Sequence, residues 1–137
     1  PADTVDYERL AKAVGVKNVR MIDPYNIKET INVIREEVHR DEPSVIITQN
    51  SPCILLRRDK PRERFKHPTY RIDNDSCTGC KMCLNVNCPA ISWVENPGTS
   101  KSGSKRKGTS FINRDQCVGC AVCFQICEVE SIVPNEQ

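Results

Sequence analysis

Long apolar runs are missing from this sequence of 137 residues. Its longest are as short as Val45-Ile46-Ile47 and Ile54-Leu55-Leu56, whereas a membrane-spanning helix needs about 20 apolar residues. We therefore expect no membrane span and no secretory signal segment. A strong charge of one sign is missing too, because 20 basic and 18 acidic residues leave a net charge of +2. That balance gives no argument for a nucleic-acid or membrane partner.

Cysteine, by contrast, is abundant, with 9 residues. A secreted disulfide scaffold is disfavoured because the count is odd, no secretory segment is visible and all but Cys53 fall into two tight clusters. We therefore expect metal ligation in a soluble, cytoplasmic protein. Cys53 follows Pro52 at the expected end of a strand and is expected to be a buried structural thiol.

Residues 1–60 alternate between helical and extended patterns, which predicts an α/β unit. Apolar residues recur at helical spacing from Tyr7 to Val14, and Gly15 follows where a helix is expected to end. Asn26 with Glu29 is a capping pair for a second helix, whose apolar stripe is Ile27, Thr30, Ile31, Ile34 and Val38. Strands are predicted from Val19 to Ile22 and from Ser44 to Thr48.

The resulting helix-strand-helix-strand order implies two parallel strands joined by a right-handed crossover. Two strands and two helices bury too little apolar surface to be stable alone, and they leave a sheet edge open. The first half is therefore expected to be an incomplete α/β fragment with a parallel sheet.

Two polar, basic stretches lie outside these elements. The first is RRDKPRERFKHP, Arg57 to Pro68, and it overlaps a predicted connector over 61–69. The second is NPGTSKSGSKRKGTS, Asn96 to Ser110. Both are typical of a solvated linker or hairpin loop. A docking patch for an acidic redox protein is the alternative for the second stretch. Aromatic residues are not interleaved with the basic ones, so a nucleic-acid partner is not expected.

Residues 70–137 contain an internal repeat with a period of forty residues. RIDNDSCTGCKMC and FINRDQCVGCAVC align without a gap, which pairs Ile72 with Ile112 and Asp75 with Asp115. The alignment also pairs the first three cysteines of each half, Cys77, Cys80 and Cys83 with Cys117, Cys120 and Cys123. A fourth cysteine follows in each half, Cys88 or Cys127, and then Ile91 or Ile132, which is expected to pack over the site.

The cysteine spacing suits an iron–sulfur cluster. Three thiolates in C-x2-C-x2-C wrap one face of a cubane, small residues such as Gly79 and Gly119 admit backbone N–H groups, and the fourth ligand comes from elsewhere. In the bacterial pattern it comes from the other half. The predicted ligands are Cys77, Cys80, Cys83 and Cys127 for one [4Fe–4S] cluster and Cys117, Cys120, Cys123 and Cys88 for the other. Structural zinc is an alternative, although its ligands usually come as two separated C-x2-C pairs.

From Tyr70 to Pro134 the sequence resembles the two-cluster bacterial-type ferredoxin domain, which implies an α+β ferredoxin-like fold. Two departures affect the expected local geometry: Glu128 follows Cys127 where the family has proline, and the gap before Cys88 is one residue longer than in the simplest ferredoxins. Trp93 is expected to pack over the first cluster arm. His39 is expected at a helix end, and His67, in the basic connector, is expected in solvent.

The resemblance extends further. The segment GVKNVRMIDPYNIKETINVIREEVHRDEPSVIITQNSPCILL, followed by CTGCKMCLNVNCPAI, is similar to the C-terminal part of the large (alpha) subunit of indolepyruvate ferredoxin oxidoreductases. This implies that residues 1–60 end a thiamine-diphosphate domain. It also implies an anaerobic, coenzyme A-acylating oxidation of an aryl pyruvate, whose electrons leave through the clusters to external ferredoxin. The implied partners are the rest of the alpha subunit and a smaller beta subunit.

The chain lacks the acidic Gly-Asp-Gly-type motif that binds diphosphate and magnesium. Thiamine diphosphate and magnesium are therefore expected only in the parent enzyme, this chain is expected to carry only electron transfer, and no catalytic residue is assigned. Two alternatives of other classes stay open. One is a stand-alone soluble two-cluster ferredoxin with an N-terminal partner-binding domain, and the other is a zinc-stabilised interaction protein.

Overall fold

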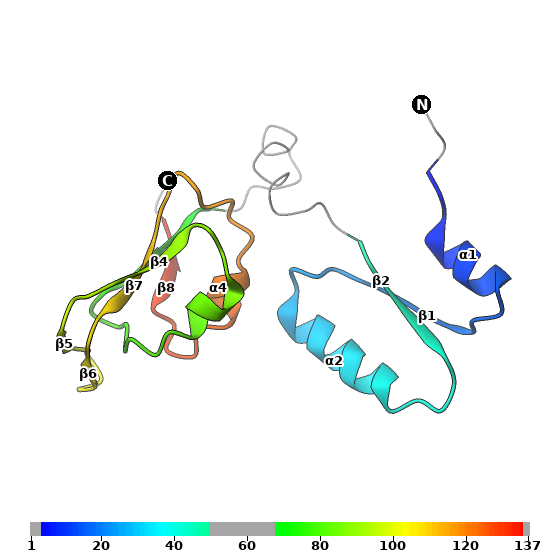
Figure 1. Cartoon of the computed structure of the whole chain (residues 1–137), viewed down its shortest axis with the longest axis horizontal. Helices are drawn as coiled ribbons and strands as arrows, with labels where there is room; N and C mark the ends of the chain where they lie inside the picture. The colour runs from blue at the N-terminus through cyan, green and yellow to red at the C-terminus, as the bar shows by residue number, and fades with distance from the viewer. Residues whose placement is uncertain (1–3, 50–67, 136–137) are drawn as a thin grey trace. The chain divides into compact units, whose positions relative to one another are not determined.

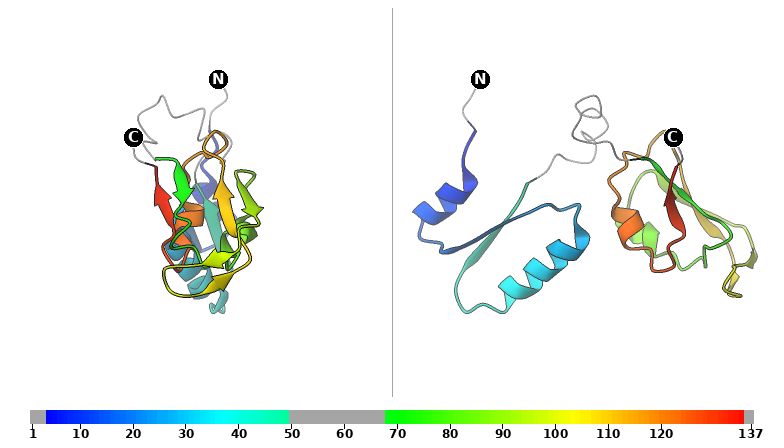
Figure 2. Two further views of the ribbon diagram at one scale, coloured as in Figure 1. Left: turned by 90° about the vertical axis from the view of Figure 1, so that its left-hand side faces the viewer. Right: turned by 180° about the vertical axis from the view of Figure 1, so that it is seen from behind.

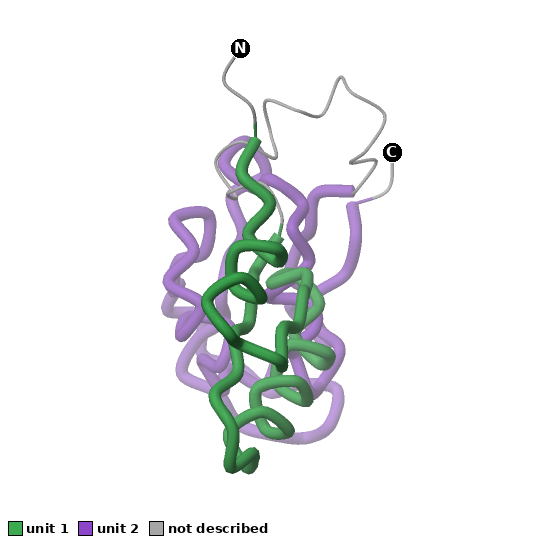
Figure 3. Tube along the Cα trace, turned by 90° about the vertical axis from the view of Figure 1, so that its right-hand side faces the viewer, with its two compact units in different colours: residues 1–50 green, residues 51–137 purple. Residues whose placement is uncertain are grey.

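The computed structural model describes residues 4–49 and 68–135, and the chain divides into two compact units, 1–50 and 51–137 (Figure 3). Cys53, His67, the boundary predicted at residue 60 and nearly all of the predicted connector lie outside the described residues. Within the described part, no helix is long and apolar enough to cross a membrane.

Unit 1 consists of α1 (Tyr7–Ala13), β1 (Asn18–Ile22), α2 (Ile27–Val38) and β2 (Ser44–Thr48). β1 and β2 pair in parallel, with Asn18 opposite Ser44 and Ile22 opposite Thr48. The two helices lie on opposite sides of this strand pair (Figures 1 and 2). The element order and the parallel pairing agree with the predicted pattern.

Local sequence signals determine where both helices begin and where α1 ends. Asp6 caps α1, and its carboxylate accepts the N–H of Arg9 at 3.0 Å. α1 ends at Ala13, and two residues later Gly15 has φ +94° and donates its N–H to the carbonyl of Lys12 at 3.0 Å. At the start of α2 the Asn26 side chain accepts the Glu29 N–H at 3.3 Å and donates to the Glu29 carboxylate at 2.8 Å, which is the predicted capping pair.

The buried side of α2 differs from the predicted stripe. The structure buries Val33 and Glu37, and the Glu37 carboxylate pairs with Arg40 at 2.7 Å and with Arg20 at 3.5 Å. Of the predicted stripe, Ile31, Ile34 and Val38 are exposed by 41%, 44% and 74%. Ile27 and Thr30 are half-buried, so unit 1 covers only part of the predicted stripe. The apolar arc of α2 is wider than the surface that a two-stranded sheet can cover.

The described part of unit 2, residues 68–135, contains three antiparallel strand pairs and two short helices: β3 (Tyr70–Ile72), the 3-10 helix η1 (Met82–Val86), β4 (Ile91–Val94), β5 (Gly98–Thr99), β6 (Lys105–Arg106), β7 (Thr109–Ile112), α4 (Val122–Gln125) and β8 (Ile132–Pro134). β3 pairs with β8, β4 with β7, and β5 with β6. In the first two pairs, the strand that opens one repeat is joined to the strand that closes the other. The two repeats are thereby interlocked in an α+β fold.

The core of unit 2 surrounds the cysteines. Its buried members are Tyr70, Ala90, Ile112, Cys117, Cys123 and Ile132. Ile132 is only 1% exposed, and the half-buried Ile91 packs against the same cluster. Both isoleucines therefore lie against the cysteine-containing core, as predicted.

Candidate metal centre

The eight clustered cysteines occupy equivalent positions in the two repeats. In the first repeat, Cys77 and Cys80 lie in the loop after β3, Cys83 lies in η1, and Cys88 follows that helix. In the second repeat, Cys117 and Cys120 lie in the loop after β7, Cys123 lies in α4 and Cys127 follows. All eight are free thiols.

Each cysteine loop begins with the same side-chain-stabilised turn. The Asp73 carboxylate accepts the N–H of Asp75 at 3.1 Å, and the Asn113 amide oxygen accepts the N–H of Asp115 at 2.9 Å. The carbonyls of Asp73 and Asn113 also accept the N–H of the first cysteine of their repeat, both at 3.0 Å. Asp73 and Asn113 were not predicted to have this role, although an Asp or Asn at the start of a turn is the usual signal for this conformation.

The loops share an unusual backbone conformation. Gly79 and Lys81 have φ values of +73° and +65°, and their counterparts Gly119 and Ala121 have +76° and +62°. A left-handed conformation at a non-glycine residue is costly. Turns that alternate in this way point successive N–H groups into a concavity that suits an anion, and iron–sulfur clusters are among the groups bound by such concavities.

Gly79 has a second constraint, because a Cβ there would lie 2.6 Å from the Gly108 carbonyl oxygen. Gly103 is a matched comparison with φ +83° and nothing within 4 Å of its Cβ position. We expect Gly79→Ala to destabilise the cluster-loaded chain by about 1 to 3 kcal/mol more than Gly103→Ala, because it adds overpacking to the shared backbone cost. Urea midpoints followed by the visible absorbance of the clusters measure this difference. Equal losses in the two variants would contradict the close approach.

The thiols fall into two groups that each combine both repeats. Burial raises the pKa of Cys83, and the neighbouring Cys80, Cys127 and Cys77 raise it further. Burial likewise raises the pKa of Cys123 to about 12, with further contributions from Cys120, Cys117 and Cys88. We call Cys77, Cys80, Cys83 and Cys127 the first thiol group and Cys117, Cys120, Cys123 and Cys88 the second thiol group. Each takes three cysteines from one repeat and the fourth from the other.

Two buried serines contact sulfur atoms of the first thiol group. Ser110 Oγ lies 3.1 Å from Cys83 Sγ, and Ser131 Oγ lies 3.3 Å from Cys127 Sγ. The Ser110 contact lowers the pKa of Cys83, against the effect of burial, because a hydroxyl stabilises the thiolate. Neither serine was predicted as a site residue, and Ser110 lies in the second basic stretch of the sequence. The structure instead buries Ser110 on β7.

The second basic stretch forms the β5–β6 hairpin and then enters the core. The Arg106 guanidinium donates to the carbonyls of Asn74 and Cys77, so it lies against the first cysteine loop and is half-buried. Lys81 Nζ lies 4.4 Å from the centre of the Trp93 ring, which confirms that Trp93 packs over the first arm. The expectation of a hairpin is confirmed, but Thr109 and Ser110 belong to a buried strand and not to a solvated loop.

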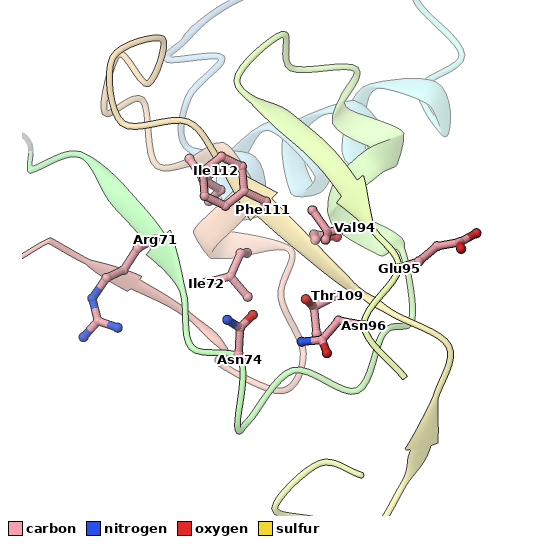
Figure 4. Close-up of a pocket in the computed structure, with 10 residues that line it drawn as sticks. Arg71, Ile72, Asn74, Val94, Glu95, Asn96, Thr109, Phe111 and Ile112 are labelled. Atoms are coloured by element: carbon pink, nitrogen blue, oxygen red, sulfur yellow. The ribbon is translucent and has the colours of Figure 1, made fainter. Parts of the chain in front are cut away.

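A pocket of about 340 Å³ opens elsewhere on unit 2. Ile72, Phe111 and Ile112 contribute apolar surface to it, and Arg71 and Glu95 lie at opposite ends (Figure 4). No cysteine lines this pocket, although Ser110, which contacts Cys83, is one of its lining residues.

The fold and the eight thiols define a class, the proteins with a two-cluster iron–sulfur domain of the ferredoxin type. Comparison with known families agrees, because residues 69–128 match the family described as "4Fe-4S dicluster domain". The chain therefore carries a domain for two [4Fe–4S] clusters.

The whole chain has more particular relatives, which are indolepyruvate oxidoreductase subunits named IorA. It is 38% identical over 95 residues to the subunit of Pyrococcus abyssi, which covers 68% of the chain and 14% of that protein. It is 38% identical over 100 residues to the subunit of Thermococcus kodakarensis, a match that covers 72% of the chain and 15% of that protein. It is 30% identical over 137 residues to the subunit of Methanothermobacter marburgensis, a match that covers 97% of the chain and 19% of that protein. The chain is thus a homologue of IorA-type subunits that spans less than a fifth of their length.

Proposed function

We propose that the chain is an electron-transfer module that holds two [4Fe–4S] clusters. In this proposal the first thiol group, Cys77, Cys80, Cys83 and Cys127, binds one cluster and the second thiol group, Cys117, Cys120, Cys123 and Cys88, binds the other. The observation that carries it is that Cys83 and Cys123 each lie near two thiols of their own repeat and one thiol of the other repeat.

The donor set fits these clusters. Each group offers four thiols, which is the ligand number of a [4Fe–4S] cluster, and each adjoins a loop with alternating left-handed residues. Among residues 4–49 and 68–135, no three His, Cys, Asp or Glu side chains are close enough to hold a single metal ion.

A bound cluster supplies reversible one-electron chemistry, and the surrounding residues adjust it. Ile132 and Ala90, both nearly fully buried, exclude water from the space beside the thiols. The Arg106 guanidinium fixes the first cysteine loop through the Cys77 carbonyl and adds positive charge beside it. The serine hydroxyls at Cys83 and Cys127 are in position to donate to thiolates once these lose their protons.

The wider activity is also a proposal. The relatives' printed names refer to indolepyruvate oxidoreductase, and we infer that this chain serves a thiamine-dependent oxidation of an aryl pyruvate. Thiamine diphosphate, magnesium and coenzyme A would bind elsewhere in the parent enzyme, with a smaller beta subunit and external ferredoxin as partners. Unit 1, with its parallel strands, would be the end of a thiamine-diphosphate domain. A cytoplasmic location, where thiols stay reduced, belongs to the same proposal.

The first thiol group is the more accessible one for an external acceptor. Cys80 is exposed, whereas Cys117 and Cys123 of the second thiol group are buried. The β5–β6 hairpin, which carries Lys105 and Lys101, contacts the first cysteine loop through Arg106. An acidic ferredoxin would complement this basic hairpin and approach Cys80.

The function is tested by anaerobic reconstitution of the full chain with iron and sulfide. We expect a brown protein with about eight iron and eight sulfide atoms per chain. We also expect electrons to pass from the reduced chain to an added ferredoxin, with a rate that falls as salt increases. Visible absorbance and stopped-flow mixing measure both. A colourless protein without acid-labile sulfide would contradict the proposal and favour the zinc alternative.

A further inference from the structure

The two serine contacts lie in the same thiol group. Ser110 is 3% exposed and Ser131 is 2% exposed, and their hydroxyls lie 3.1 Å from Cys83 Sγ and 3.3 Å from Cys127 Sγ. The first contact joins residues 27 positions apart, on η1 and β7. Both cysteines belong to the first thiol group, one from each repeat.

The internal repeat provides a direct comparison, because Cys123 is the counterpart of Cys83 and Cys88 is the counterpart of Cys127. In the described part of the chain, neither Cys123 nor Cys88 has a hydrogen bond from a side-chain hydroxyl. The gap-free repeat alignment pairs Ser110 with Tyr70. Tyr70 is buried near Cys123. Burial raises the pKa of the Tyr70 hydroxyl, and the neighbouring Cys123 raises it further. The repeat therefore has a small hydroxyl donor beside one group and a bulky aromatic ring beside the other.

Hydrogen bonds to cysteine sulfur affect the potential of an iron–sulfur cluster in a known direction. Reduction adds a negative charge, and a hydroxyl that donates to a ligand sulfur stabilises the more negative state. The stabilisation is larger in a buried, low-dielectric site, which is where both serines lie. Exposure of Cys80 and the Arg106 guanidinium near Cys77 act in the same direction.

We propose that Ser110 and Ser131 raise the reduction potential of the cluster held by the first thiol group above that of the cluster held by the second. The inference rests on the proposed function, because it needs the ligand sets given there. The favoured internal transfer moves one electron from the cluster of the second thiol group, which is oxidised, to that of the first, which is reduced. No bond or proton is exchanged. The electron then rests beside exposed Cys80, where an external acceptor can approach.

The test is a redox titration of the reconstituted full chain, followed by EPR. The serine variants are made in a Cys120→Ser background. This change removes only the cluster held by the second thiol group, so a single EPR signal remains to be assigned. In this background we expect Ser110→Ala and Ser131→Ala each to favour the oxidised state by up to about tenfold, which is about 59 mV for a one-electron couple. Ser110→Thr keeps a hydroxyl and is expected to retain most of the original potential.

Ser92→Ala is the matched control, since Ser92 is an exposed serine on the adjacent strand β4. It is expected to leave the potential unchanged. A Cys77→Ser background, which keeps only the other cluster, is expected to show no shift from either serine variant. The inference is overturned if both alanine variants retain four iron atoms per chain and the original potential, or if both clusters shift equally. The ligand assignment is tested separately by iron counts, so failure of one proposal is distinguishable from failure of the other.

Discussion

Cys127→Ser is expected to remove the cluster held by the first thiol group while leaving the cluster held by the second thiol group in place. The thiols that neighbour Cys83 include Cys127 from the other repeat, and those that neighbour Cys123 include Cys88. Iron in the reconstituted chain should therefore fall from about eight to about four atoms for either Cys127→Ser or Cys88→Ser. The two single variants should differ in which cluster survives.

Double variants turn this difference into a simple iron count. Cys127→Ser combined with Cys80→Ser should retain about four iron atoms, because both changes affect the first thiol group. Cys127→Ser combined with Cys120→Ser should retain almost none, because one ligand is lost from each group. If each repeat instead held its own cluster, the two results would be exchanged, and the crossed ligation would be wrong.

Much of unit 2 could be predicted because the sequence carries its information twice. The repeat fixed the equivalence of the two cysteine loops, and the strand pairs β3–β8 and β4–β7 show that each repeat is completed by the other. The crossed ligand sets came from a known spacing pattern, and as ligation they stay a prediction. Family comparison agrees with the resemblance to a two-cluster domain over residues 69–128.

Ser110 and Arg106 could not be found in this way, because their contacts join positions far apart in the sequence, whereas Ser131 contacts Cys127 over only 4 positions. Ser110 reaches Cys83 across 27 residues, and Arg106 reaches Asn74 across 32. Neither periodicity nor cysteine spacing encodes which side chain of a distant strand will face a sulfur atom. The basic composition around these residues also favoured a solvated loop, since charge patterns report average exposure and not individual contacts.

The burial of Val33 and Glu37 on α2 was not predicted, for a different reason. Helical periodicity detects an apolar arc, but Ile27, Ile31, Ile34 and Val33 together make an arc wider than one sheet face. Which part of it is buried depends on what lies next to the helix. Only two strands are present among residues 4–49, and they cover the side with Val33 and Glu37.

The incomplete cover of the apolar side of α2 affects the stability of the first half of the chain. We expect residues 1–60, expressed without residues 61–137, to be largely unfolded or self-associated. Among residues 4–49 only two apolar side chains, Ile22 and Val33, are fully buried, and α1 buries none. Each such side chain contributes about 1.5 to 3 kcal/mol. Ordering costs about 1.5 kcal/mol for every residue, so two buried side chains and their half-buried neighbours do not offset it over such a length.

Amide dispersion by NMR and size-exclusion chromatography measure the state of this fragment, and the reconstituted fragment 61–137 is the matched control. That control is expected to fold, because its core and cluster ligands all lie within it. The exposed stripe of Ile31, Ile34 and Val38 indicates that unit 1 needs further apolar cover, which in the proposed parent enzyme would come from the rest of the thiamine-diphosphate domain. Replacing Ile34 by lysine should therefore improve the solubility of the isolated fragment without making it fold. A monomeric 1–60 fragment with a cooperative melting transition would contradict this account and favour an independent partner-binding domain on a stand-alone ferredoxin.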